Sequence, residues 1–196
     1  MVQNKNPRPH NQVRIIAGKW RGRKLSFSPI QDLRPTPDRV RETLFNWLQF
    51  DLVGKRCLDL FAGSGVLGFE AASRGATTVS LLESHPTAVR QLQQNVALLK
   101  ADNIEIIAQD AIKFLQHTDA QSYDVIFLDP PYKLKLLQAC IAQIEEKRCL
   151  AERGILYFEQ ATTGPGIDLS TAWTITHKKS AGQVCYCLAT FSSVAN

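Results

Sequence analysis

The 196-residue chain is predicted to be an α/β protein with a mostly parallel seven-stranded sheet and helices on both faces. Between residues 57 and 158, short apolar stretches typical of buried strands alternate with helical stretches, which is the order of repeated βα units. Two more strand-like stretches, 173–179 and 184–191, are joined by Ser180-Ala181-Gly182. This last pair predicts an antiparallel hairpin at the C-terminal edge of the sheet.

The N-terminal quarter predicts a small β-hairpin followed by a helix. Residues 13–18 and 24–27 have strand character, with a turn at 19–23 between them. Thr36 suits the N-cap of the helix and Pro37 its first position. Apolar residues then recur at helical spacing, at Val40, Leu44, Trp47 and Leu48, with the helix ending near Phe50. Arg39 and Arg41 fall outside this apolar stripe, and we divide the chain into a basic N-terminal extension, 1–33, and an α/β domain, 34–196.

The remaining elements follow in order along the α/β domain. Parallel strands are expected at residues 57–60, 78–82, 104–108, 124–128 and 154–158. The helix after the glycine motif is expected to end near residue 73. The three later helices are expected at about 86–99, 111–116 and 134–147. The stretch 124–128 has four successive apolar residues after Asp124, as a parallel strand that is buried on both faces requires.

Positive charge is concentrated in the first quarter of the chain. Residues 1–50 contain ten Lys and Arg against three Asp and Glu, whereas the remainder contains thirteen against fifteen. This asymmetry accounts for the formal net charge of +5 and is typical of proteins that bind a polyanion such as nucleic acid. A solvated basic tail is the alternative interpretation of the same charges.

Several classes of protein and site are not indicated by the sequence. The apolar stretches have the length of strands rather than of membrane spans, and the N-terminus does not resemble a signal peptide. The five cysteines form no Cys-x-x-Cys pair, so we expect buried, reduced thiols in a cytoplasmic protein and no metal site. Cys185 and Cys187 should point to one face of a sheet, which suits core packing.

A glycine motif follows the first parallel strand and opens a helix. Gly63-x-Gly65-x-x-Gly68 allows a ligand to approach the backbone closely, and Glu83, after the next strand, is placed to bind ribose hydroxyls. Glycines in this context fit NAD, FAD or S-adenosylmethionine, or only a tight βα turn. Asp59 favours S-adenosylmethionine, because a carboxylate beside the loop suits an ammonium and a sulfonium better than a pyrophosphate.

The same cofactor site is expected to include three more residues. Asp110 follows the third strand and could accept a hydrogen bond from the adenine amino group, or cap the next helix, or do both. We also assign Phe61 of the glycine motif and Ala111, next to Asp110, to cofactor binding.

The motif Asp129-Pro130-Pro131-Tyr132 follows the fourth parallel strand and predicts a catalytic site at the edge of the sheet where ligands bind. An exocyclic amino group of a base is a poor nucleophile, because its lone pair is delocalised into the ring. Asp129 and the Pro130 carbonyl can each accept one of its N–H bonds and so free the lone pair, while Tyr132 can stack on the base. Two consecutive prolines stiffen this segment, although a simple proline-rich turn is the alternative interpretation.

Three segments of the chain resemble the bacterial RsmD family of small-subunit (16S) ribosomal RNA guanine-N2 methyltransferases. They are residues 14–25 (RIIAGKWRGRKL), residues 34–48 (RPTPDRVRETLFNWL) and residues 181–184 (AGQV), and the resemblance extends over about 13–190. It implies a Rossmann-like S-adenosylmethionine-dependent methyltransferase fold and methylation of one guanine N2 in an assembled or assembling small subunit. The RNA-binding residues that we assign on this basis are Arg14, Lys19, Arg21, Arg23, Arg34, Thr36 and Arg39.

Two other functions remain open from the residues alone. A DNA adenine-N6 or cytosine-N4 methyltransferase shares the Asp-Pro-Pro-Tyr motif, but such an enzyme normally carries a target-recognition domain that this chain has little room for. A non-catalytic RNA-binding assembly factor would not need Asp59, Glu83 and Asp129. We expect the protein to act as a monomer.

Overall fold

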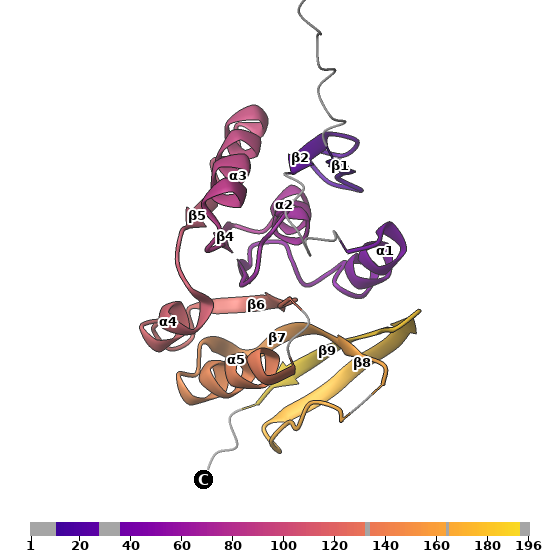
Figure 1. The fold of residues 1–196 in the computed structure, drawn as a ribbon, viewed down its shortest axis with the longest axis vertical. Helices are drawn as coiled ribbons and strands as arrows, with labels where there is room; N and C mark the ends of the chain where they lie inside the picture. The colour runs from indigo at the N-terminus through magenta and orange to yellow at the C-terminus, as the bar shows by residue number, and fades with distance from the viewer. Residues whose placement is uncertain (1–10, 28–35, 132–133, 164, 193–196) are drawn as a thin grey trace, which may run out of the picture.

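The computed structural model describes residues 11–27, 36–131, 134–163 and 165–192. It confirms the predicted seven-stranded sheet, whose strand order is β5-β4-β3-β6-β7-β9-β8 (Figure 1). The first five strands of this order are parallel, whereas β9 runs antiparallel to both of its neighbours. The strands are β3 (Arg56–Asp59), β4 (Thr78–Leu82), β5 (Ile104–Ile107), β6 (Tyr123–Leu128), β7 (Leu150–Ala161), β8 (Trp173–Ala181) and β9 (Val184–Phe191).

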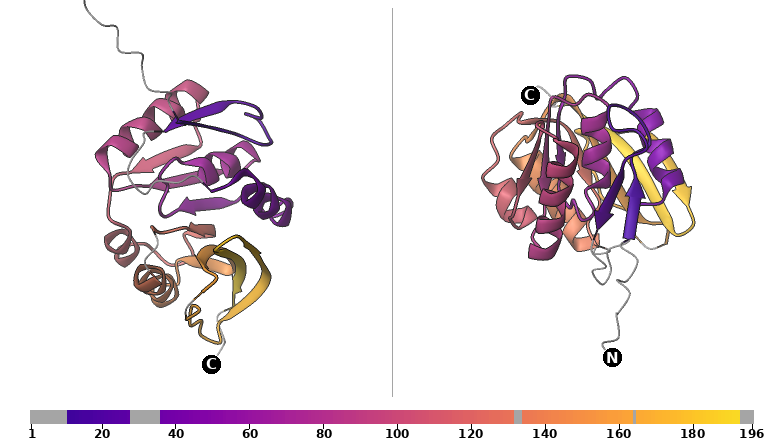
Figure 2. Two further views of the ribbon diagram at one scale, coloured as in Figure 1. Left: turned by 45° about the vertical axis from the view of Figure 1, so that its right-hand side comes forward. Right: turned by 90° about the horizontal axis from the view of Figure 1, so that it is seen from above.

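Helices cover both faces of the sheet (Figure 2). On one face, α1 (Asp38–Trp47), α2 (Val66–Ser73) and α3 (Pro86–Leu99) share an apolar core with residues of β3, β6 and β7. On the other face, α4 (Ala111–Gln116) and α5 (Leu134–Glu146) share a second core with the same sheet. The α3 and α4 bounds agree with the sequence prediction, because Pro86 and Asp110 are clear N-terminal signals.

An N-terminal hairpin, β1 (Asn11–Arg14) and β2 (Lys24–Phe27), lies beside α2 and α3 (Figure 1). Its apolar residues Ile15, Trp20 and Leu25 are buried in the core that contains α1 and α2. The first strand is shorter than the predicted 13–18, because the backbone N–H groups after Ile15 donate to α2 instead of to a strand.

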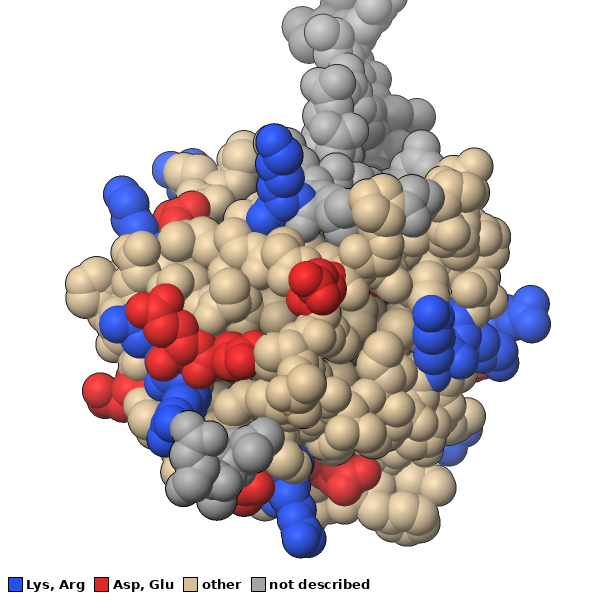
Figure 3. Space-filling view, turned by 90° about the horizontal axis from the view of Figure 1, so that it is seen from below, with Lys and Arg blue, Asp and Glu red and all other residues tan. Residues whose placement is uncertain are grey.

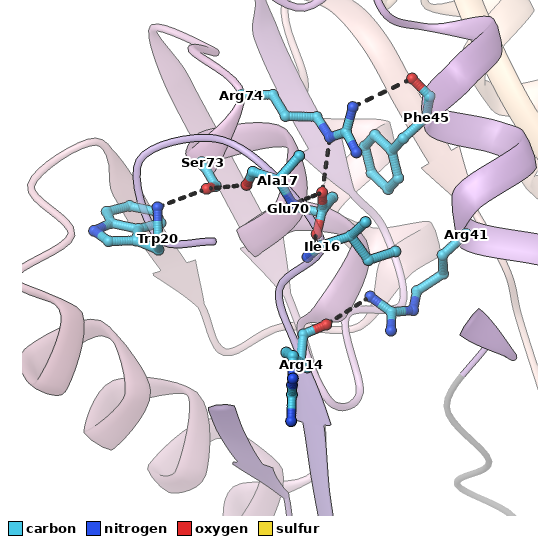
Figure 4. Close-up of polar contacts among 9 residues, drawn as sticks. All are labelled: Arg14, Ile16, Ala17, Trp20, Arg41, Phe45, Glu70, Ser73 and Arg74. Carbon is cyan, nitrogen blue, oxygen red and sulfur yellow. Dashed lines mark hydrogen bonds and ion pairs between the residues drawn. The ribbon is translucent and has the colours of Figure 1, made fainter. Parts of the chain in front are cut away.

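Glu70 of α2 holds this hairpin against the domain (Figure 4). The N–H of Ile16 donates to Glu70 Oε2 at 2.7 Å, and the N–H of Ala17 donates to Oε1 at 3.0 Å. Arg74 Nε donates to the same Oε1 at 2.7 Å, and Glu70 is fully buried. The sequence analysis did not identify this carboxylate, although an acid within the apolar run of α2 signals a buried partner.

Ser73, at the end of α2, makes a second set of contacts with the hairpin. Its hydroxyl accepts a hydrogen bond from the N–H of Trp20 at 2.9 Å and donates to the carbonyl of Ala17 at 2.6 Å. Gly18 has a φ of +80°, and a Cβ there would approach the Ser73 carbonyl oxygen to 1.9 Å. Only glycine therefore allows the chain to pass this close to α2.

Three features of α1 differ from the sequence prediction. Pro37 rather than Thr36 occupies the N-cap position, and the helix ends at Trp47. Arg41, placed off the apolar stripe, is fully buried, because its guanidinium donates to the Arg14 carbonyl at 3.1 Å and to Asp38 Oδ1 at 2.7 Å. The long alkyl part of an arginine side chain can pack in a core when its charged end finds such acceptors.

The strand β7 is longer than the predicted 154–158. Its additional residues pair with β6 at one end, as Leu150 does with Tyr123, and with β9 at the other, as Ala161 does with Val184. All five cysteines are free and buried, as predicted, and the sulfurs of Cys185 and Cys187 lie 4.0 Å apart on one face of β9. Within the described ranges, the helices lack the length and apolar character that crossing a membrane requires.

Candidate active site

Four of the predicted acidic residues lie at the carboxyl ends of four parallel strands. Asp59 is the last residue of β3, and Glu83, Asp110 and Asp129 follow β4, β5 and β6 within three residues. Because these strands are parallel neighbours in the order β5-β4-β3-β6, the four carboxyl groups share one edge of the sheet. Ligands of open α/β sheets bind at this edge.

The glycine loop between β3 and α2 is fixed by β4. The N–H of Gly63 donates to Glu83 Oε2 at 3.0 Å, and the N–H of Ala62 donates to the carbonyl of Leu82 at 2.9 Å. Gly65 has a φ of +77°, and a Cβ there would lie 2.6 Å from the side chain of Leu92. The other oxygen of Glu83 accepts the N–H of His85 at 2.7 Å, which leaves further lone pairs of this carboxylate for a ligand.

Asp59 connects the end of β3 to the first turn of α2. Its Oδ2 accepts a hydrogen bond from the N–H of Gly68 at 3.0 Å, and only 3% of Asp59 is exposed. Burial and the nearby charge of Glu83 raise the pKa of Asp59 to about 7, although the N–H of Gly68 acts in the opposite direction. Gly68 is needed for this close packing, because a Cβ there would approach the Leu81 side chain to 2.1 Å.

Asp110 caps α4, as one of its two predicted roles requires. Its Oδ1 accepts a hydrogen bond from the N–H of Lys113 at 3.0 Å. Ala111 is the buried first residue of α4, and Phe61 is half-buried in the glycine loop. Adenine binding by Asp110 stays a prediction.

Asp129 has an electrostatic environment unlike that of a surface carboxylate. Burial and the charges of Glu159 and Asp59 raise its pKa to about 8. The hydroxyl of Thr36 donates to Asp129 Oδ2 at 3.4 Å, which opposes this shift. Thr36 thus contacts the carboxylate of the Asp-Pro-Pro-Tyr motif rather than the first turn of α1. Pro130 is buried next to Asp129, whereas Tyr132 lies outside the described residues.

Glu159 is a second carboxylate at this position that the sequence analysis missed. Leu128 of β6 pairs with Phe158 of β7, and the next residues along the two strands are Asp129 and Glu159. The hydroxyl of the buried Tyr157 donates to Glu159 Oε1 at 2.6 Å, and burial raises the pKa of Glu159. Glu159 directly follows the apolar stretch 154–158, as Asp129 directly follows 124–128. The same pattern could therefore have indicated Glu159 as a site residue.

The predicted RNA-binding residues that the structure describes, apart from the buried Thr36, are exposed side chains of the hairpin and of α1. They are Arg14, Lys19, Arg21, Arg23 and Arg39. The guanidinium of Arg23 also donates to the carbonyl of Leu98 in α3 at 3.4 Å. Arg34 lies outside the described residues.

A pocket of about 370 Å³ separates the hairpin from the start of α1. It is lined by Gln12, Val13, Arg14, Lys24, Thr36, Pro37 and Asp38. Thr36 therefore belongs both to this pocket and to the surroundings of Asp129. Through Thr36, the wall of the pocket touches the carboxylate of Asp129.

The face of the molecule in Figure 3 is not uniformly basic. On the face in Figure 3, Lys and Arg side chains stand mainly toward the outline, and several Asp and Glu side chains lie between them. No group of three or more metal-ligating side chains occurs in the part of the chain that the structure describes.

Comparison with known proteins gives consistent matches over nearly the whole chain. The model of the family described as conserved hypothetical protein 95 matches residues 13–190. The Escherichia coli (strain K12) protein named ribosomal RNA small subunit methyltransferase D is 42% identical over 175 residues, which is 89% of this chain and 88% of that protein.

Solved structures share the fold. That of yhhF from Escherichia coli has a TM-score of 0.87 at 41% identity and covers 93% of this chain and 99% of that one. An RNA methyltransferase from Salinibacter ruber in complex with S-adenosyl-L-homocysteine has a TM-score of 0.65 over 83% of this chain and 97% of that one. At 17% identity, the second likeness shows the fold alone, and this fold is the predicted Rossmann-like methyltransferase fold.

Proposed function

Because the chain belongs to the ribosomal RNA small subunit methyltransferase D (RsmD) family, we propose that it is an S-adenosylmethionine-dependent ribosomal RNA methyltransferase. In more detail, we propose that it methylates the exocyclic N2 amino group of one guanine in 16S ribosomal RNA. The substrate is the assembled or assembling small subunit, and the protein acts as a cytoplasmic monomer. Residues 1–33 form its basic extension and residues 34–196 its catalytic domain.

The donor groups at the sheet edge fit S-adenosylmethionine better than a dinucleotide. Asp59 begins the glycine segment and Glu83 accepts the N–H of Gly63, and two carboxylates beside the loop disfavour a pyrophosphate. The proposed cofactor-binding residues are Asp59, Phe61, Gly63, Gly65, Glu83, Asp110 and Ala111. Bound S-adenosylmethionine would supply a methyl group that its sulfonium makes electrophilic.

Asp129, Pro130 and Tyr132 form the proposed catalytic group. In its ionised form, Asp129 accepts one N–H of the amino group while the Pro130 carbonyl accepts the other, so the nitrogen lone pair becomes available. Tyr132 stacks on the base, which must leave any helical stack to reach this position. Asp129 need not remove a proton before transfer, because the alkylated nitrogen is strongly acidic, and positioning provides most of the rate enhancement.

The observation that carries this proposal is the position of Asp129. Its carboxylate follows a buried parallel strand, close enough to Asp59 of the glycine loop for the two charges to influence each other. A nucleophile held by Asp129 therefore lies next to the proposed cofactor. We also propose that the exposed basic side chains of the hairpin and Arg39 bind phosphates near the target base, together with Arg34 and Thr36.

The direct test is methylation of small subunits from cells that lack the protein. Purified protein and labelled S-adenosylmethionine should introduce one methyl group, and mass mapping should place it on a guanine N2 of 16S ribosomal RNA. Naked ribosomal RNA and DNA serve as parallel substrates. Transfer to DNA alone would overturn the proposal, and a cofactor that does not bind in calorimetric titration would favour a non-catalytic assembly factor.

A further inference from the structure

Glu159 lies beside the proposed catalytic carboxylate and has no part in the methyl transfer described so far. It follows Phe158, the residue paired with Leu128, in the register of β6 and β7. Side chains two residues apart in a strand share a face, so Glu159 lies on the face of Tyr157, and Asp129 on that of Phe127. The rings of Phe127 and Tyr157 are in contact, with centroids 6.3 Å apart, so the two carboxylates project from the same face.

The two carboxylate oxygens of Glu159 differ in the hydrogen bonds that they accept from the described residues. The hydroxyl of Tyr157 donates to Oε1 at 2.6 Å, and Tyr157 itself is fully buried. Among the described residues, none donates a hydrogen bond to Oε2. The negative charge of Glu159 also acts on Asp129, in agreement with the strand register that makes the two residues neighbours.

The chemistry of the bases shows what such a pair selects. Guanine carries a proton on N1, next to its amino-bearing carbon, so its edge presents N1–H and the N2 amino group as adjacent donors. In adenine and cytosine, the ring nitrogen next to the amino group on the Watson–Crick edge is an unprotonated acceptor. A second carboxylate accepts the N1–H of guanine, but it repels the ring-nitrogen lone pair of adenine or cytosine.

We propose that Glu159 is a specificity-determining residue that accepts the N1–H of the target guanine through Oε2, while Asp129 holds the N2 amino group. This inference rests on the proposed guanine-N2 methylation and explains how the site excludes the other two amino bases. A site built to hydrogen-bond a substrate N–H rejects an analogue that lacks it far more strongly than an apolar pocket could.

The test uses 2-aminopurine, which keeps the N2 amino group but has a lone pair at N1. Small subunits are reconstituted with guanine or 2-aminopurine at the mapped target, and kcat/KM is measured for both with the full-length protein. Wild type should prefer guanine by roughly 10²-fold or more. In Glu159→Gln, the Tyr157 hydroxyl still donates to Oε1, so the amide NH₂ faces the base and suits the lone pair of 2-aminopurine.

The preference for guanine should therefore fall by roughly 10²-fold in Glu159→Gln. Glu105→Gln, the same change on the exposed surface of β5, should keep the wild-type ratio. Equal loss of activity on both bases in Glu159→Gln would mean a structural role and overturn the inference. A wild type that methylates both bases equally would also overturn it, even if the variant does not fold. A wild type that methylates no guanine contradicts the proposed function instead.

Discussion

Glu70 is fully buried and Asp129 is half-buried, and the surroundings of the two carboxylates differ. Glu70, beneath the N-terminal hairpin, accepts two backbone N–H groups and the Nε of Arg74 at 2.7–3.0 Å. Asp129 follows β6; among the described residues it accepts one hydroxyl at 3.4 Å, and two other carboxylates repel it. The first carboxylate is fully satisfied by the protein, whereas the second retains acceptor capacity for a ligand.

We expect this difference to separate a structural carboxylate, Glu70, from a functional one, Asp129. A buried acid with a complete set of donors stabilises the packing of the elements that supply them, here the hairpin, α2 and Arg74. A carboxylate with a raised pKa and few donors is a candidate for binding or catalysis. Substitutions at the two positions should therefore have opposite consequences for activity and stability.

The largest expected effect is on transfer in Asp129→Ala. Methylation of small subunits should fall by roughly 10²–10⁴-fold, because one acceptor for the amino group is lost. Binding of S-adenosylmethionine, measured by calorimetric titration, should be largely retained, and the thermal midpoint should not decrease. Turnover like that of wild type would remove Asp129 from its catalytic role.

Glu70→Ala should lower the free energy of unfolding by about 3–5 kcal/mol, because it leaves Arg74 and two N–H groups without their acceptor. Glu70→Gln, which keeps one carbonyl oxygen, should cost less. Denaturant unfolding followed by circular dichroism measures both changes. If Glu70→Ala is as stable as wild type, the hairpin is held by its apolar contacts alone.

Local patterns predicted much of the fold and part of the site. The bounds of α3 and α4 and the carboxylates Asp59 and Asp129 follow from caps, periodicity and motifs within a few residues. Arg41 was mispredicted because its acceptor, the Arg14 carbonyl, is 27 residues away. Glu159 depends on the pairing of β6 with β7, and strand pairing between distant segments is not visible in a local pattern.

The pH dependence of stability tests the environment of Asp129 without an activity assay. Its folded pKa of about 8 lies above the ordinary value of 3.8, so the folded protein keeps a proton that the unfolded chain releases as the pH rises from 4 to 8. The contribution of Asp129 to stability is present below about pH 4 and is lost through this window, by at most about 1.4 kcal/mol per pH unit.

Asp129→Asn removes this contribution but leaves Asp59 and Glu159, whose charges face it, and the Thr36 hydroxyl in place. The variant should therefore become more stable relative to wild type between pH 5 and pH 8, as measured by denaturant unfolding at each pH. If the free energies of unfolding of the two proteins change in parallel with pH, Asp129 is ionised throughout this range. Its surroundings would then not differ from those of Glu70 in the way described above.

The smallest expected effect concerns the outer surface of the hairpin that Glu70 anchors. Arg21→Ala with Arg23→Ala should weaken binding to small subunits and lower the slope of log affinity against log salt by about 0.7–0.9 per lost phosphate contact. Stability should change little, because both side chains are exposed. The control is Arg148→Ala with Arg153→Ala, which removes two exposed arginines just before and near the start of β7. If both pairs reduce the salt slope equally, the hairpin contributes only general charge, and Glu70 anchors a structural element rather than an RNA-binding one.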